Sequence, residues 1–242
     1  MLDTGEGGRC RSATDGRAWA GIPPYLEKTY WWAYLRPASI GVFDHPLVVA
    51  AILWGNYRRL TDAVLAEIAP GRSVLQMAAV YGDLSQRLAR HVGPEGTIEI
   101  VDAAPIQVAN AGRKLAPYPW ATVRVADAAR LDARPRDCVL SFFLLHELPD
   151  AEKHRAVAAA LAHVAPGGRA IFVDYHRPAR WHPVRPVMAA VFALLEPFAA
   201  RMWTMEIAAM AAPGRAFHWR KATLFGGLYQ LVIAERGCAC RD

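Results

Sequence analysis

The sequence lacks an apolar run long enough to cross a membrane, because a spanning helix needs about 18 consecutive apolar residues. Its best candidate, residues 187–195, ends at Glu196 and Pro197. The beginning of the chain contains acidic side chains and no apolar block, which disfavours a secretory signal and an organelle transit peptide. We therefore expect neither a transmembrane segment nor a cleaved targeting segment.

Cysteine is also scarce, with four residues in 242, which are too few and too scattered for a disulfide framework. They are Cys10, Cys138, Cys238 and Cys240. A single residue separates Cys238 from Cys240, which is not the spacing of a zinc-binding pair. The scarcity favours a reducing compartment, and we expect the bacterial cytoplasm.

The sequence also lacks a dense run of positively charged residues. Its net charge is nevertheless +6, because it contains 28 Lys and Arg residues and 22 Asp and Glu residues. Basic residues spread along the chain disfavour nucleic acid as a partner and leave anionic lipids or substrates open. The eight tryptophans are numerous for this length, and Trp54 is followed by Arg58 and Arg59. Tryptophan near arginine suits a bilayer surface or an apolar ligand, and the alternative is ordinary packing in the core.

Changes in sequence pattern predict three parts. Residues 1–21 are rich in Gly, Arg and Asp and are expected to be a mobile leader. Residues 22–69 predict a helical cap of two helices, one over 25–35 and one over 44–68 with Asp44 as its N-cap. Residues 70–242 predict the main domain, with a helical insertion at about 184–212 that Pro197 interrupts.

The main domain alternates short apolar runs with helical patterns. We expect strands at 74–78, 97–101, 122–125, 138–144 and 170–173, helices at 84–91, 106–115 and 151–164, and a final hairpin of 217–224 and 229–234. This alternation predicts an α/β fold, a Rossmann-like sheet that is mostly parallel with an antiparallel last strand and helices on both faces.

Ligands of such sheets bind beyond the carboxyl ends of the strands, so the residues that follow each strand are the candidates for a site. They are Gln76, Ala78, Val80, Tyr81, Gly82 and Asp83 after the first strand, Asp102 and Ala103 after the second, Asp127 and Ala128 after the third, His146 after the fourth, and Asp174 and His176 after the fifth. Asp102 follows Gly82 by 20 residues, which is the place of an acid that binds a ribose diol.

In their order these elements resemble the class I methyltransferases that use S-adenosylmethionine (SAM). The resemblance covers residues 74–175 and includes the Gly-Asp-Leu-Ser turn at 82–85, Asp102, the Ala-Asp-Ala element at 126–128 and the Pro-Gly-Gly lead-in at 166–168. Within that group the sequence looks closest to the methyltransferases of quinone biosynthesis. The resemblance to class I methyltransferases implies a seven-stranded sheet. It also implies that SAM is bound by residues that follow the first three strands: residues from Gln76 to Asp83, with Asp102, Ala103, Asp127 and Ala128.

The first turn departs from that family. Gln76 stands where an acid is usual, Ala78 and Val80 replace two glycines, and Tyr81 replaces a small hydroxyl residue. Only Gly82 keeps the freedom of a residue without a Cβ atom. We expect these changes to alter how the cofactor lies in its pocket.

With this departure, the motifs at 30–37, 52–57 and 225–229 make the sequence similar to the RquA family of rhodoquinone biosynthesis from about residue 23 onward. The resemblance implies that ubiquinone is converted to rhodoquinone by replacing a ring methoxy group with an amino group. It also implies that SAM donates the nitrogen, with help from a divalent metal, preferably Mn²⁺. Gln76 would favour the neutral, nucleophilic form of the cofactor amine by removing a nearby negative charge.

Two residues are candidates for catalysis. His146 would protonate the departing methoxy group, with a structural role as the alternative. Tyr81 would contact the quinone or the cofactor, with filling of space as the alternative. Asp174 and His176 have side chains that could bind Mn²⁺. The more common interpretation of such a pair is that the aspartate caps a turn and the histidine lies on the surface. The metal ligands therefore stay unknown.

Ubiquinone lies in the bilayer, so the resemblance implies peripheral contact with the inner face of a bacterial membrane. The aromatic segments 25–54 and 184–203 would form that contact surface, or would simply cap the sheet. No obligate protein partner is evident. Two other functions remain open: conventional methyl transfer to a quinone or a phenol, and a non-catalytic fold that binds a lipid or a partner.

Overall fold

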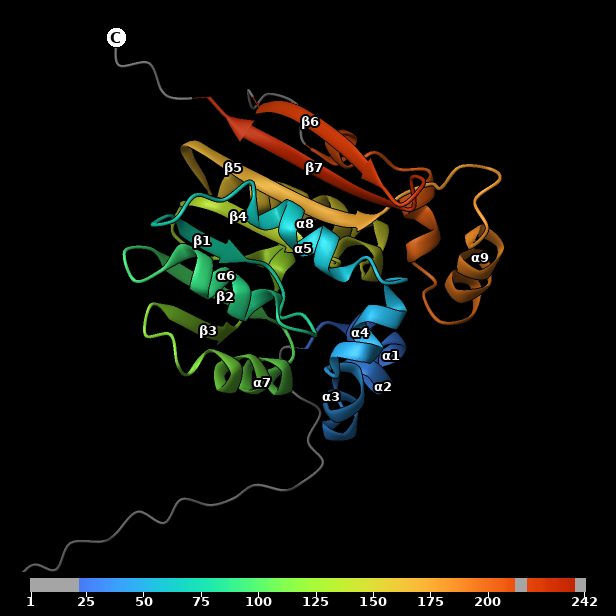
Figure 1. Ribbon diagram of the computed structural model, residues 1–242, viewed down its shortest axis with the longest axis horizontal. Coiled ribbons are helices and arrows are strands. Elements are labelled where there is room, and N and C mark those ends of the chain that lie inside the picture. Colours follow the sequence, from blue (N-terminus) through green and yellow to red (C-terminus); the bar gives the residue numbers. More distant parts are fainter. Residues whose placement is uncertain (1–21, 212–216, 238–242) are drawn as a thin grey trace, which may run out of the picture.

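The computed structural model describes residues 22–211 and 217–237 (Figure 1). The expected leader at 1–21 and three of the four cysteines lie outside these residues. The fourth, Cys138, is a buried free thiol. No helix among the described residues is both long and apolar enough to cross a bilayer.

A seven-stranded sheet organises the described chain, in the order β3-β2-β1-β4-β5-β7-β6. Its strands are β1 Ser73–Gln76, β2 Thr97–Asp102, β3 Ala121–Val125, β4 Arg136–Phe142, β5 Val164–Tyr175, β6 Phe217–Leu224 and β7 Tyr229–Arg236. The first five strands are parallel, and β7 runs antiparallel to both β5 and β6. The predicted fold class is therefore confirmed, including the final hairpin and the antiparallel last strand.

Helices cover both faces of this sheet, as the alternating pattern predicts. Figure 1 shows α5 (Tyr57–Leu65), α6 (Leu84–Val92) and α7 (Pro105–Leu115) along one face and α8 (Asp150–Ala162) behind the other. The central strands are therefore buried on both sides, which explains why residues 138–142 of β4 are all buried. The helix α6 buries Leu84, Leu88 and Val92, spaced by four residues on a single face.

The N-terminal helices differ from the prediction in where they break. Four short helices replace most of the two expected ones: α1 Pro24–Thr29, α2 Trp31–Tyr34, α3 Pro37–Phe43 and α4 Pro46–Ile52. Residues 37–43, expected to separate the two helices, are helical because proline is well suited to the first helical position. The expected helix over 44–68 is interrupted at Trp54 and Gly55, whose φ angles of 52° and 76° are left-handed.

Asp44 does not cap the following helix, as we expected from the sequence. His45 is the N-cap of α4, and its side chain accepts a hydrogen bond from the Leu47 amide. The Asp44 carboxylate instead accepts the Gly82 amide at 2.7 Å and pairs with Lys114 at 2.7 Å. It therefore joins the N-terminal helices to the loop that follows β1.

The predicted helical insertion consists of α9 (Arg185–Leu194) followed by the short 3₁₀ turns η3 (Ala199–Trp203) and η4 (Ile207–Met210). The break falls around Pro197, as predicted. In Figure 1, α9 and the helices α1–α4 lie beyond the carboxyl ends of the parallel strands. These segments therefore enclose the region where a ligand of this fold is expected to bind.

Two glycines provide a test of packing in this fold. A Cβ atom at Gly168 would lie 2.6 Å from the Asp137 carbonyl oxygen, whereas one at Gly112, exposed on α7, would meet nothing within 4 Å. Gly168→Ala should lower the free energy of unfolding by about 1–3 kcal/mol because backbone must move to admit the methyl group. Gly112→Ala should raise it by about 0.5–1 kcal/mol because alanine favours the helix. Urea unfolding measures both, and equal effects of the two changes would contradict the packing described here.

Candidate functional site

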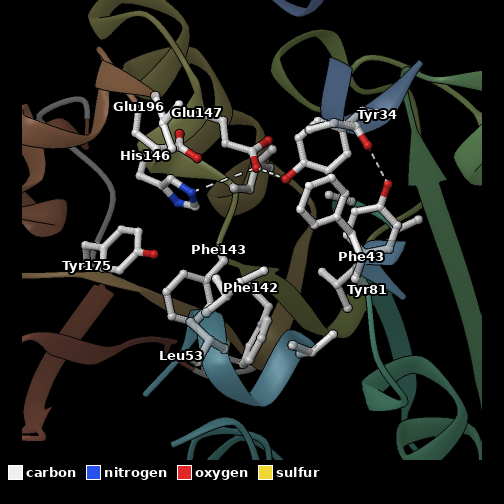
Figure 2. A pocket seen from close by; sticks show the side chains of 18 of the residues that line it. Tyr34, Phe43, Leu53, Tyr81, Phe142, Phe143, His146, Glu147, Tyr175 and Glu196 are labelled. Atoms are coloured by element: carbon white, nitrogen blue, oxygen red, sulfur yellow. Dashed lines mark hydrogen bonds and ion pairs between the residues drawn. The ribbon is translucent and has the colours of Figure 1, made fainter. Parts of the chain in front are cut away.

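A cavity of about 430 Å³ lies at the carboxyl ends of the parallel strands, beneath the N-terminal helices and α9. Residues 77–81 after β1 and 142–144 at the end of β4 line it, together with side chains of the N-terminal helices. Figure 2 shows Tyr34 and Tyr81 on one side and His146 with two glutamates on the other. The site is thus apolar and aromatic with one polar wall, the usual composition of a small-molecule site.

The loop after β1 depends on its remaining glycine. Gly82 has a φ of 86°, and a Cβ atom there would lie 2.6 Å from the Tyr57 hydroxyl oxygen. That hydroxyl accepts the Leu84 amide at 2.7 Å, at the beginning of α6. Gly82 is therefore required by the approach of Tyr57 and stands behind the cavity lining.

Gln76, expected to face the cofactor, is fully buried and does not line the cavity. Its Nε2 atom donates to the Ala78 carbonyl at 2.7 Å, and its side chain is also hydrogen-bonded to Ser85. A carboxylate at this position could not donate to Ala78. The amide therefore braces the loop against α6, and its proposed effect on a cofactor amine stays a prediction.

Tyr81 lines the cavity with its ring and uses its hydroxyl elsewhere. The ring stacks on Tyr34 at 5.7 Å, and the hydroxyl donates to the Ala33 carbonyl at 2.6 Å. It also accepts from Gln107 Nε2 at 2.8 Å. The residue thus holds the N-terminal helices on the loop, while direct contact of its hydroxyl with a substrate stays a prediction.

Asp102 lines the cavity where the sequence places a ribose-binding acid. Its two carboxylate oxygens accept the Ala79 amide at 2.9 Å and the Ala104 amide at 2.8 Å. Burial raises the pKa of Asp102 to about 6, although both hydrogen bonds favour the charged form. The carboxylate is therefore held in a fixed orientation beside the β1 loop.

The expected cofactor-binding residues divide into two groups. Those that line the cavity are Ala78, Val80, Tyr81, Asp102, Ala103 and Ala128. Gln76, Gly82, Asp83 and Asp127 do not line it. Asp127 accepts the Ala129 amide at 2.9 Å and pairs with Arg130 at 2.6 Å, so it orders the turn that carries Ala128.

His146 lines the opposite wall and is held by Asp174, which is fully buried at the end of β5. Asp174 accepts from the imidazole Nδ1 at 3.1 Å and from the His146 amide at 3.2 Å. Burial lowers the pKa of His146, but the charge and hydrogen bond of Asp174, together with the charges of Glu196 and Glu147, raise it to about 9. The imidazole is therefore a cation at neutral pH, with Nε2 turned away from Asp174.

Glu147 and Glu196 complete this wall, and neither was predicted from the sequence to be a site residue. Glu147 Oε1 lies 3.8 Å from His146 Nε2 and accepts a hydrogen bond from the Tyr34 hydroxyl. Burial and neighbouring carboxylates raise the pKa of Glu147 to about 8, against the lowering effect of His146. Burial also raises the pKa of Glu196. Two signals in the sequence could have identified these residues. Glu147 directly follows His146, and Glu196 is the single acid that ends an apolar helical segment.

The possible metal pair is not brought together as a site. Asp174 faces His146, whereas His176 Nδ1 contacts the Gly227 carbonyl oxygen at 2.8 Å. Within the ranges that the structure describes, no three His, Cys, Asp or Glu side chains are grouped so as to hold a metal ion. The described side chains therefore do not fit the Mn²⁺ that the family resemblance implies.

The Asp174–His146 pair predicts a pH dependence of stability. The pKa of His146 is about 9 in the folded protein and about 6.5 in an unfolded chain. The stabilisation is therefore complete below about pH 6.5 and is lost as the pH rises through 9, with a total of about 3 kcal/mol. Glu147 also makes the protein less stable as the pH rises, because its pKa is higher in the folded protein than in the unfolded chain.

Asp174→Asn should abolish the part of this pH-dependent loss of stability that arises from the titration of His146. Urea unfolding near pH 6 and above pH 9 measures it, with Asp62→Asn as the control because Asp62 is an exposed partner of Arg87. The same pH dependence in Asp174→Asn and the wild type would contradict the assigned pair.

Residues 74–168 match the family described as a methyltransferase domain. No curated protein sequence matches the chain significantly. A solved structure with this fold is a SAM-dependent methyltransferase from Aquifex aeolicus, at 18% identity and a TM-score of 0.54, covering 82% of this chain and 97% of that chain.

Two further structures share the fold. The N-methyltransferase NodS from Bradyrhizobium japonicum WM9 is 12% identical with a TM-score of 0.54, covering 74% of this chain and 96% of that chain. The [4+2]-cyclase SpnF is 16% identical with a TM-score of 0.54, covering 75% of this chain and 82% of that chain. The chain therefore has the Rossmann-like fold of class I methyltransferases and carries a methyltransferase-like domain over residues 74–168.

Proposed function

We propose that the protein is a SAM-dependent enzyme that replaces a methoxy group of a lipid-soluble quinone with an amino group, as the resemblance to the RquA family implies for ubiquinone and rhodoquinone. The observation that carries this proposal is the position of His146, held by Asp174 on the wall of an apolar cavity and beside Glu147. This group is suited to donate a proton to a leaving group. The methyltransferase-like fold supplies the expected place for SAM.

The residues of the cavity fit SAM. Asp102 is held by two backbone amides with its carboxylate at the cavity wall, where it would accept hydrogen bonds from the ribose hydroxyls. Ala128 would lie beside the adenine, and Ala78 and Val80 would lie along the rest of the cofactor. When bound, SAM would supply the nitrogen.

An aromatic ring with an isoprenoid tail suits the remaining surface. Phe43, Phe142, Phe143 and Tyr175 line the cavity, and their rings offer apolar faces to a quinone. Leu53, directly after α4, and Val191 of α9 add to this surface. Because such a substrate stays in the bilayer, we propose that the enzyme works at the inner face of a bacterial membrane.

The polar wall would then act on the leaving methoxy group. A new bond from nitrogen to the ring carbon replaces the bond from that carbon to the methoxy oxygen, which leaves as methanol once it receives a proton. His146 holds a proton on Nε2 at neutral pH because Asp174 stabilises the imidazolium. Glu147, with its raised pKa, would return a proton to His146. The proton released by the attacking nitrogen balances the one that methanol removes. The bond from this nitrogen to the α-carbon of SAM would be broken by water, which would leave the amino group on the ring and a hydroxyl group on that carbon.

The raised pKa of His146 also bears on the choice between reactions. Methylation of a phenol needs a base to remove the hydroxyl proton, and an imidazole that is already protonated is a poor base at neutral pH. Amination with loss of methanol needs an acid at the methoxy oxygen in addition to a base for the attacking nitrogen. The ionisation of this wall would supply the acid that amination needs and conventional methyl transfer does not.

Expression in a host that makes ubiquinone and lacks rhodoquinone tests the reaction. We expect mass spectrometry of extracted lipids to show the aminoquinone, with its nitrogen labelled when SAM carries ¹⁵N in its amino group. Expression of His146→Gln at the same level is the matched control. Good expression without any aminoquinone would rule out the proposed function.

Variants of the polar wall test the role of the proton donor. Glu147→Gln and His146→Gln should lower turnover by about 10²–10⁴-fold because the methoxy oxygen loses its proton supply. SAM binding, measured by calorimetry, should change little. Glu206→Gln, on an exposed carboxylate paired with Lys221, should leave turnover unchanged. Full turnover in both wall variants would show that the proton comes from elsewhere.

A conventional methyltransferase acting on a quinone or a phenol is the second candidate, supported by the match of residues 74–168 to a methyltransferase domain. It predicts transfer of a labelled methyl group and release of S-adenosylhomocysteine. A non-catalytic protein that binds a lipid or a partner is the third. Calorimetry that detects no SAM binding would favour it over both enzymes.

A further inference from the structure

Exposed large apolar side chains are concentrated in two segments. Among the described residues ten such side chains are exposed, and nine of them belong to residues 31–54 or 181–195. The first segment contributes Trp31, Val42, Leu47, Ile52 and Trp54, and the second contributes Trp181, Val187, Leu194 and Leu195. Only Val125, on β3, lies elsewhere. Scattered exposed apolar residues are normal, whereas a concentration of this kind marks an interaction surface.

The two segments meet at the mouth of the cavity. Ile52 and Trp54 from one segment and Leu195 from the other are exposed and also line the cavity. Trp54 Nε1 lies 3.3 Å from Met188 Sδ on α9, so the segments are in direct contact. We call the nine exposed side chains of these segments the mouth surface. Its members Ile52, Trp54 and Leu195 lie where an apolar ligand would enter on its way to His146.

The segments that carry the mouth surface contain more basic than acidic residues, while Glu27, Asp62 and Glu196 lie directly beside them. Residues 176–195 contain Arg177, Arg180 and Arg185 and no acid. Residues 28–61 contain a single acid, Asp44, which Lys114 neutralises. Their basic residues include Arg58 and Arg59, both exposed and, among the described residues, without an ion pair. Arginine with exposed tryptophan and leucine is the composition of a surface that lies in the interface of an anionic bilayer.

We propose that the mouth surface inserts its apolar side chains into the headgroup region of an anionic bilayer, so that the cavity opens directly toward the acyl chains. This inference deepens the proposed function, on which the identity of the lipid substrate rests. A folded protein partner on the same surface would cover the mouth of the cavity. A bilayer would instead present a lipid-soluble substrate there while the arginines contact lipid phosphates.

Vesicle sedimentation with the full chain tests this surface without quinone or SAM. The wild type should bind vesicles of phosphatidylcholine with phosphatidylglycerol and bind pure phosphatidylcholine vesicles much more weakly. Leu47→Asp combined with Leu194→Asp should weaken binding by about tenfold or more, because each carboxylate would enter the interface. Neither leucine lines the cavity, and both are highly exposed, so folding should be preserved. Circular dichroism and thermal unfolding check this.

Val125→Asp is the matched control, because it adds a charge at the exposed apolar side chain outside the mouth surface. It should bind vesicles like the wild type, whereas Arg177→Gln with Arg180→Gln should lose the preference for phosphatidylglycerol. The absence of vesicle binding, or equal loss in the control, would overturn the proposal. Sedimentation velocity that shows a dimer, lost in the leucine variant, would assign the surface to a second copy of the chain instead.

Activity on quinone dispersed in detergent separates this inference from the proposed function. Aminoquinone formation in detergent without vesicle binding would leave the reaction standing and remove the surface. Vesicle binding without aminoquinone formation would retain the membrane-binding surface and rule out the proposed reaction.

Discussion

The polar wall of the cavity depends on the buried pair of Asp174 and His146. Asp174 has no exposed surface. Its carboxylate accepts hydrogen bonds from the backbone amide and the ring of His146 and from the Tyr175 amide. A buried carboxylate of this kind persists only when it is paired, because burial without compensation is costly. The pair therefore fixes both the end of β5 and the turn after β4, and it keeps a cation next to Glu147 and Glu196.

The sheet could be predicted from the sequence because its pattern is local. Apolar runs bounded by turns located all seven strands, and the Gly226–Gly227 turn located the hairpin. Asp102 and His146 could also be placed at the cavity, since the carboxyl ends of parallel strands share one edge of a sheet. The N-terminal helices were less predictable, because left-handed Trp54 and the buried Tyr30 break them for reasons of tertiary packing.

The polar wall could be predicted only in part. Glu196 lies 50 residues after His146, and neither periodicity nor spacing relates the two before the chain folds. Gln76 illustrates the opposite difficulty: the sequence located it at the carboxyl end of β1, but the direction of its amide depends on Ala78 and Ser85. Sequence patterns fix which edge of the sheet a residue occupies. The hydrogen-bond partners decide whether that residue faces a ligand or supports the loop.

Gly82 has a consequence for how this chain can diverge. A glycine in this loop is usually attributed to a cofactor that approaches the backbone, yet here the Tyr57 hydroxyl occupies the space that a Cβ atom would need. The two positions therefore constrain each other: a relative with a larger residue at position 82 should carry a smaller one at position 57, and the residue at position 82 should be one that tolerates a positive φ, such as asparagine. Such paired replacements would let the loop drift away from the glycine-rich pattern while the sheet beneath it stays the same.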